Sequence, residues 1–215
     1  MLARALFRPA LRQIVASQSL VRPSVRALSR SDSEFLSWVE EQLEHEKARN
    51  VSDLSGGWSK PKSEGAIGII NREKDGEKVT VRFNLNGSMP TLEEQDLMEE
   101  KGEEPLCLPD FEIIVEKTGG KKIWLNCQYN MDDEAHDDDD AFDIISVMIG
   151  DDSAELPYVM NTDSMDASFY DQLMNFIEQR GIDEKFLEDL AVSATDLENN
   201  LYRQSLVDMK DFFKN

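Results

Sequence analysis

Two runs of carboxylate side chains are the groups in this sequence best suited to bind another molecule. At this density like charges repel one another, which keeps the chain extended and solvated, and they attract cations. For a single acid, a merely solvating role is the simpler interpretation. For each run as a whole we predict a binding site for basic proteins or peptides, made by Asp132, Asp133, Glu134, Asp137, Asp138, Asp139 and Asp140 in one run and by Glu99, Glu100, Glu103 and Glu104 in the other.

The same carboxylates could hold metal ions, because hard oxygen ligands suit calcium and magnesium. Neither run has acids at alternate positions with a turn glycine and a terminal glutamate, the pattern of a dedicated calcium loop. We expect weak and diffuse cation binding with no specific metal site. A low-affinity calcium buffer is therefore an alternative function.

The sequence contains few of the residue patterns that form catalytic sites. Its two histidines are His45, in a predicted helix, and His136, inside the denser acidic run. No phosphate-cradling glycine loop or dinucleotide fingerprint is present, and the acids lie in hydrophilic runs that would not raise a carboxyl pKa. We predict that the protein is not an enzyme and needs no cofactor; an unrecognised hydrolase is the remote alternative.

Charge also narrows the class of partner. The chain has 23 Lys and Arg against 44 Asp and Glu, a formal net charge of -21. Six arginines and no acid lie in residues 1–30, so the rest carries 17 basic residues against 44 acidic ones, a net charge of -27. Direct nucleic-acid binding depends on clustered Lys and Arg and is not expected. No apolar run is long enough to span a membrane.

The first 30 residues resemble an import signal. Their arginines are spaced among leucines and other apolar residues, which permits a helix with one basic and one apolar face. A membrane-surface helix and a basic nucleic-acid arm are the alternatives. We predict a mitochondrial presequence over 1–30, cleaved near residues 28–31, followed by one domain over 31–215 that lies in the mitochondrial matrix.

The remaining sequence predicts an α+β domain with an antiparallel sheet. A helix should begin near Ser31, which has capping-box spacing to Glu34, and Phe35, Val39 and Leu43 fall at helical intervals along it. Alternating apolar residues and glycine turns predict strands over 66–71, 78–84, 111–117, 122–129, 142–149 and 158–161. Trp58 is expected in the core, and Cys107 and Cys127 have no disulfide or metal-site spacing and should be reduced thiols.

Two acidic insertions interrupt the strands, at about 86–109 and 131–141, and both are predicted to be mobile because they lack a sustained period. Two helices should follow the last strand. Asp163 or Ser164 can cap the first, and Asp183 the second. The second carries a narrow apolar seam at Leu187, Leu190, Ala194, Leu197 and Leu201. This seam could pair with Phe35, Val39 and Leu43 of the first helix and join the subunits of an oligomer, or it could simply pack on the chain's own sheet.

Several stretches of the sequence resemble the mitochondrial glycoprotein family of acidic matrix proteins. They are Ser55-Gly56-Gly57-Trp58, Gly76-Glu77-Lys78-Val79-Thr80-Val81, Gly120-Lys121-Lys122, and the long match that begins at Tyr158 and Asn161-Thr162-Asp163-Ser164 and ends at Arg180-Gly181. The resemblance covers essentially all of 31–215. The two acidic insertions depart from the family pattern, so partner contacts made by them are the least transferable.

The resemblance implies a twisted antiparallel sheet of about seven strands, flanked by one N-terminal and two C-terminal helices, with the first and last helices paired. It also implies a ring-shaped homotrimer with unevenly distributed negative charge, and no catalytic residues. The function it implies is support of mitochondrial translation and oxidative phosphorylation. Together with the charge, it suggests a chaperone-like scaffold that shields basic clients such as ribosomal or RNA-associated proteins.

Overall fold

A computed structural model describes residues 28–102, 104–130, 141–151 and 158–214 of the chain. The order of elements follows the sequence: α1 (Arg30–His45), β1 (Lys62–Glu64), β2 (Ile67–Lys74), β3 (Glu77–Asn84), α2 (Leu92–Lys101), β4 (Phe111–Lys117), β5 (Lys122–Tyr129), β6 (Phe142–Gly150), β7 (Val159–Asn161), a 3-10 turn (Thr162–Ser164), α3 (Ala167–Glu178) and α4 (Glu184–Lys214).

The strands form one antiparallel sheet in sequence order, from β1 to β7. This confirms the α+β class and the seven-stranded sheet. Alternation decides which face is buried: Val79, Val81 and Phe83 of β3 point into the core, and the residues between them point to the opposite face. The Asp75-Gly76 turn joins β2 and β3 as predicted, with positive φ at both residues.

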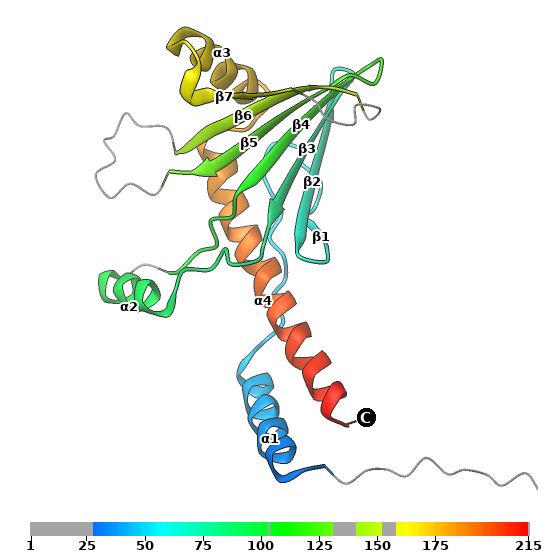
Figure 1. The fold of residues 1–215 in the computed structure, drawn as a ribbon, viewed down its shortest axis with the longest axis vertical. Coiled ribbons are helices and arrows are strands. Elements are labelled where there is room, and N and C mark those ends of the chain that lie inside the picture. The colour runs from blue at the N-terminus through cyan, green and yellow to red at the C-terminus, as the bar shows by residue number, and fades with distance from the viewer. Residues whose placement is uncertain (1–27, 103, 131–140, 152–157, 215) are drawn as a thin grey trace, which may run out of the picture.

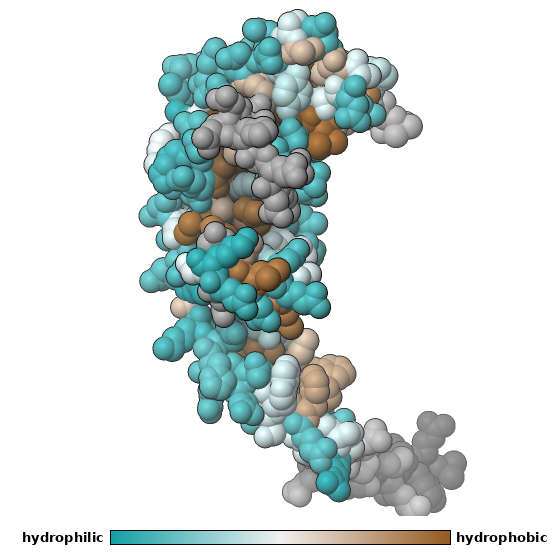
Figure 2. Space-filling model, turned by 90° about the vertical axis from the view of Figure 1, so that its left-hand side faces the viewer, coloured by the Kyte–Doolittle hydropathy of each residue, from teal (hydrophilic) through white to brown (hydrophobic). Residues whose placement is uncertain are grey.

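Helices α3 and α4 supply the other half of the core. Ile177 and Leu190 are fully buried in one hydrophobic cluster with the inward residues of the sheet. In Figure 1, α4 runs behind the sheet and continues well beyond it, and α1 lies along this projecting half. The face of the molecule in Figure 2 is largely hydrophilic, with apolar patches at several heights.

Several local predictions were wrong. The capping box of α1 is Ser29 with Asp32 rather than Ser31 with Glu34, because the helix begins at Arg30. The cap of α3 is Asp166, since Asp163 and Ser164 form a separate 3-10 turn. Strand β1 and helix α2 were not predicted, so the described chain has four α-helices rather than three.

The free edge of β6 is closed by side chains where β7 is too short to pair with it. The Ile144 amide donates to the Tyr170 hydroxyl at 3.1 Å, and the Thr162 hydroxyl donates to the Ile144 and Ile145 carbonyls at 2.5 and 3.0 Å. Unpaired strand edges invite another chain to pair. Here α3 and its 3-10 turn protect that edge.

Candidate interaction surfaces

Some of the acidic residues predicted to bind basic partners lie among the described residues, and the others do not. Glu99 and Glu100 lie on α2, and Glu104 follows that helix; Glu100 and Glu104 are exposed. The other predicted residues, Asp132, Asp133, Glu134, Asp137, Asp138, Asp139, Asp140 and Glu103, lie outside the described residues. Helix α2 is therefore the part of the predicted surface whose geometry can be analysed.

Helix α2 is defined by local signals at both ends. The Glu94 carboxylate accepts hydrogen bonds from the Thr91 amide at 2.7 Å and the Thr91 hydroxyl at 2.8 Å, which lower the Glu94 pKa. Gly102, with φ of +78°, follows the last helical residue. This capping box was readable in the sequence as Thr91-Leu92-Glu93-Glu94, but the absence of an apolar period obscured it.

The segment that carries α2 is attached firmly to the body after the helix. Cys107 is fully buried, and its amide donates to the Thr195 hydroxyl of α4 at 2.8 Å. The Leu108 amide donates to the Ser88 carbonyl at 3.2 Å, which closes the base of the insertion. The insertion predicted at 86–109 thus contains a helix and a buried anchor.

The connector between α1 and β1, residues 46–61, runs antiparallel to α4 and is bonded to it by a series of polar side chains. The Asn200 amide group exchanges two hydrogen bonds with the Arg49 backbone, at 3.0 and 2.9 Å. The Asp196 carboxylate accepts from both the amide and the hydroxyl of Ser52, at 3.0 and 2.9 Å, and Asp189 does the same for Ser55, at 3.0 and 2.7 Å. The sequence analysis missed this series because the partners are far apart in the chain.

These bonds place α1 against the projecting half of α4. Val39 and Leu206 are buried, the rings of Phe35 and Phe213 lie 5.0 Å apart, and Glu40 pairs with Lys210 and Lys214 at 3.3 and 2.7 Å. The predicted pairing of the first and last helices is thus present. Phe35 and Val39 belong to this contact, and Leu43 is half-buried on the same helix.

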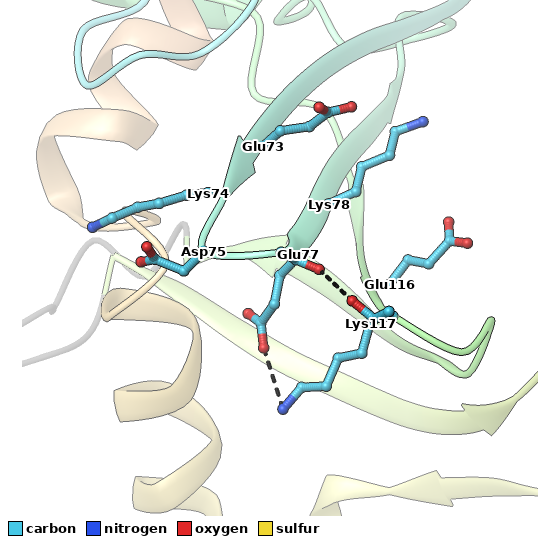
Figure 3. A pocket seen from close by; sticks show the side chains of 9 residues that line it. Glu73, Lys74, Asp75, Glu77, Lys78, Glu116 and Lys117 are labelled. Atoms are coloured by element: carbon cyan, nitrogen blue, oxygen red, sulfur yellow. Dashed lines mark hydrogen bonds and ion pairs between the residues drawn. The ribbon is translucent and has the colours of Figure 1, made fainter.

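A groove of about 630 Å³ lies between the ends of the β2–β3 and β4–β5 hairpins, lined by Glu73, Lys74, Asp75, Gly76, Glu77, Lys78, Glu116, Lys117 and Thr118. Figure 3 shows lysines and carboxylates interspersed around it. Burial opposes ionisation of Glu77, but Lys117 and Arg180 outweigh it and lower the pKa of this carboxyl. Arg180 forms two hydrogen bonds with Glu77, at 2.9 and 3.1 Å, and so joins α3 to the hairpin.

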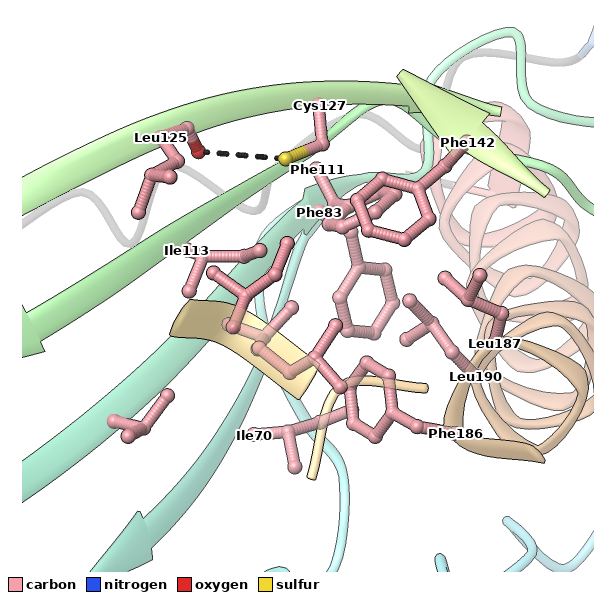
Figure 4. Packing of buried hydrophobic residues seen from close by; sticks show 14 of the residues in the cluster. Ile70, Phe83, Phe111, Ile113, Leu125, Cys127, Phe142, Phe186, Leu187 and Leu190 are labelled. Atoms are coloured by element: carbon pink, nitrogen blue, oxygen red, sulfur yellow. Dashed lines mark hydrogen bonds between the residues drawn. The ribbon is translucent and has the colours of Figure 1, made fainter. Parts of the chain in front are cut away.

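The apolar seam predicted on α4 is divided between two environments. Leu187, Leu190, Ala194 and Leu197 are buried in the same cluster as the strands, and Leu201 packs partly against it. Figure 4 shows Leu187 and Leu190 facing the phenylalanines of the sheet. The alternative in which these residues pack on the chain's own sheet is therefore realised in this chain, and α1 contacts the later part of α4.

Four aromatic rings remain accessible at the free end of the α1–α4 pair. Phe35 contacts both Trp38 and Phe213, with ring centroids 6.0 and 5.0 Å apart, and Phe213 contacts Phe212 at 5.2 Å. Trp38 is 49% exposed and Phe212 76% exposed. An apolar patch of this kind commonly marks a contact with another protein chain.

Within the described ranges, no three His, Cys, Asp or Glu side chains are grouped to hold a metal ion. Cys107 and Cys127 are free and buried, and burial raises the pKa of both thiols, which keeps them protonated and unreactive.

Trp58 is a core residue, as predicted, with its ring 4.7 Å from that of Phe186. No described helix has the length and apolar character needed to cross a membrane.

Comparison with known proteins relates most of the chain to one family. A profile of the family described as "mitochondrial glycoprotein" matches residues 39–213. The mouse (Mus musculus) protein "complement component 1 Q subcomponent-binding protein, mitochondrial" is 34% identical over 203 residues, which cover 86% of this chain and 73% of the mouse protein. The human (Homo sapiens) protein of the same name is 32% identical over 203 residues, covering 85% and 72%.

Two solved structures share the fold. A Leishmania major protein of unknown function, described as a sequence homologue of human p32, matches with a TM-score of 0.63 at 16% identity, covering 85% of this chain and 99% of the other. The Trypanosoma brucei p22 protein matches with a TM-score of 0.59 at 14% identity, covering 86% and 100%. The helices and the seven-stranded sheet are therefore a shared architecture.

Proposed function

Because this chain belongs to the mitochondrial glycoprotein family, we propose that it is a non-enzymatic protein of the mitochondrial matrix that binds basic client proteins and shields their cationic segments. The relatives are named as mitochondrial and as binding a subcomponent of complement component 1. The basic N-terminal 30 residues would be the import signal. The clients would be ribosomal or other RNA-associated proteins, whose shielding supports mitochondrial translation and oxidative phosphorylation.

The excess of acid is the observation that carries this proposal. A chain with 44 acidic and 23 basic residues generates a strong negative field. Such a field destabilises a compact protein through self-repulsion, but it also raises the rate of encounter with cationic partners. On α2 the exposed carboxylates of Glu93, Asp96 and Glu100 have no ion-pair partner among the described residues. They are available to a basic client.

The assembly that we propose is a ring-shaped homotrimer. Its subunit contact would use the exposed aromatic rings at the end of the α1–α4 pair, which this chain leaves uncovered. A closed ring would concentrate the charge of three chains on one particle and strengthen its attraction for basic segments.

Peptide binding tests the proposed function directly. We expect the protein from residue 29 onward to bind a lysine-rich peptide in dilute buffer, with an affinity that falls steeply as salt is added, because exposed charges are screened. Calcium at matched charge concentration should bind much more weakly. Absence of peptide binding at low ionic strength would refute the proposal.

Neutralising the denser acidic run tests whether its charges bind the peptide or instead support assembly of the protein. Replacing Asp132, Asp133 and Asp137 to Asp140 by Asn should weaken peptide binding without changing the elution volume of the protein on a sizing column. A change of oligomeric state would show that these residues serve assembly instead.

A further inference from the structure

Helix α2 is encoded by its own sequence but contributes nothing to the core. Its capping box and its terminal glycine are both in place, yet none of its described side chains is buried. In Figure 1 it stands apart from the sheet and from the helices. Isolated helices shorter than about 12 residues are marginal in water, so the two caps stabilise this short helix only weakly without packing from a partner.

The two faces of α2 differ in what they carry. At about 100° per residue, Leu92, Asp96, Glu100, Glu93 and Leu97 follow one another around an arc of about 140°. The half-buried Gln95 and Met98 lie on the opposite side. We call the arc from Leu92 to Leu97 the outer face of α2: two leucines with three carboxylates between them.

The outer face has no partner in this chain. Leu92 is 79% exposed and Leu97 58% exposed. Its three carboxylates form no ion pair or hydrogen bond with any described residue, whereas Glu94, outside the arc, is occupied by Thr91. Figure 2 views the molecule from the side on which α2 projects, and apolar surface lies there within hydrophilic surface.

We propose that the outer face of α2 is a docking site for a basic amphipathic segment of a client protein, with Lys or Arg side chains against the three carboxylates and apolar side chains against Leu92 and Leu97. Charge complementarity selects this occupant, since the face carries three negative charges and no positive one. The leucines also require apolar side chains in the partner, which a purely electrostatic surface would not. This inference rests on the proposed function and specifies both one site and the class of segment that it accepts.

Docking also accounts for the local construction of the insertion. The buried anchor at Cys107 and the Leu108–Ser88 bond hold the base of α2 to the body, so the helix is presented at a defined place. The caps keep a short segment near its helical form before a client arrives. Both features lower the ordering cost of binding.

Two peptides of equal charge separate the parts of the proposal: a helical peptide of lysines and leucines, and one in which serines replace the leucines. Replacing Glu93, Asp96 and Glu100 by Gln, Asn and Gln should weaken both about tenfold at low salt. The matched control replaces three exposed acids elsewhere, as Glu41→Gln, Asp171→Asn and Glu178→Gln, and should have a much smaller effect. Leu92→Gln with Leu97→Gln should weaken only the leucine-containing peptide, also about tenfold, whereas Val192→Gln should not.

Hydrogen exchange gives a second measurement that does not depend on the variants. The amides of residues 92–101 should become more protected when the leucine-containing peptide binds. Unchanged exchange, together with wild-type affinity in the outer-face variants, would overturn the docking site while leaving the proposed function intact. Failure of the unmodified protein to bind either peptide would refute both. A change in the protein's own elution volume caused by Leu92→Gln with Leu97→Gln would instead identify the outer face as a contact between copies of this chain.

Discussion

Removal of the Asp196 carboxylate should loosen the connector's attachment to α4 around Ser52. In the structure one carboxylate oxygen accepts two hydrogen bonds from Ser52, at 3.0 and 2.9 Å, and Asp196 is only 8% exposed. Asp196→Ala leaves both Ser52 donors without this acceptor in a partly buried site. A hydrogen bond to a charged group contributes about 1.5–3 kcal/mol, and part of this is recovered from water that enters. We expect a loss of about 2 kcal/mol in the free energy of unfolding.

Urea unfolding measures the global effect, and limited trypsin digestion measures the local one. Lys47 and Arg49 are exposed residues of the connector, and the backbone beside them must leave α4 before it can enter the trypsin active site. A loss of about 2 kcal/mol corresponds to about 30-fold faster cleavage when opening and closing are rapid. Asp196→Asn is the matched control, because the amide oxygen can still accept and the shape is kept. Equal stability and equal cleavage in Asp196→Ala and the unmodified protein would refute the reasoning.

Three further results are expected. Gly181→Ala should destabilise the protein by at least about 1 kcal/mol in urea unfolding, because Gly181 has φ of +78° and an added Cβ would collide with the Arg72 guanidinium; Gly102→Ala, which has open space, is the comparison. Lys185 and Ser55 lower the pKa of Asp189 to about 2. The ionised carboxylate should therefore contribute about 2 kcal/mol to the free energy of unfolding above pH 4, and this contribution should disappear as the pH falls toward 2. A stability profile unchanged by Asp189→Asn would contradict this. Phe212→Ser should release smaller species on a sizing column with little loss of subunit stability, whereas Val192→Ser should not, and identical elution would remove the aromatic cluster from the subunit contact.

Much of the fold could be predicted because its signals are local. Alternation along Val79, Val81 and Phe83 identified a strand with one buried face, and the Asp75-Gly76 pair identified its turn. Asp183 was predicted to cap α4, and its carboxylate accepts from the Phe186 amide at 2.9 Å. Strand β1 escaped prediction because its three residues are all exposed and owe their conformation to pairing with β2. Helix α2 escaped because it has no apolar face.

The spacing of the apolar residues along the α4 seam could not decide which surface the seam packs against. A repeat of leucines shows that one side of a helix is buried, but it does not show against what. Packing assigns Leu187 to Leu197 to the sheet and leaves Leu206 and Phe213 for α1. The consequence is practical: Leu190→Asp, which would probe an oligomer if the seam joined subunits, would place a charge in the core of this chain and unfold it.

By itself the sequence determined the charge of the protein, most of its strands and helices, and the family to which it belongs, since composition, alternation and short motifs are properties of neighbouring residues. Tertiary structure alone decided where distant parts meet. Asp189 and Asp196 became acceptors for serines more than 100 residues away, and the side of α2 that carries Leu92 and Leu97 was left uncovered by the rest of the chain. The physical reason is that a side chain's role depends on which donors, charges and apolar surfaces surround it, and folding brings these together from segments that the sequence keeps apart.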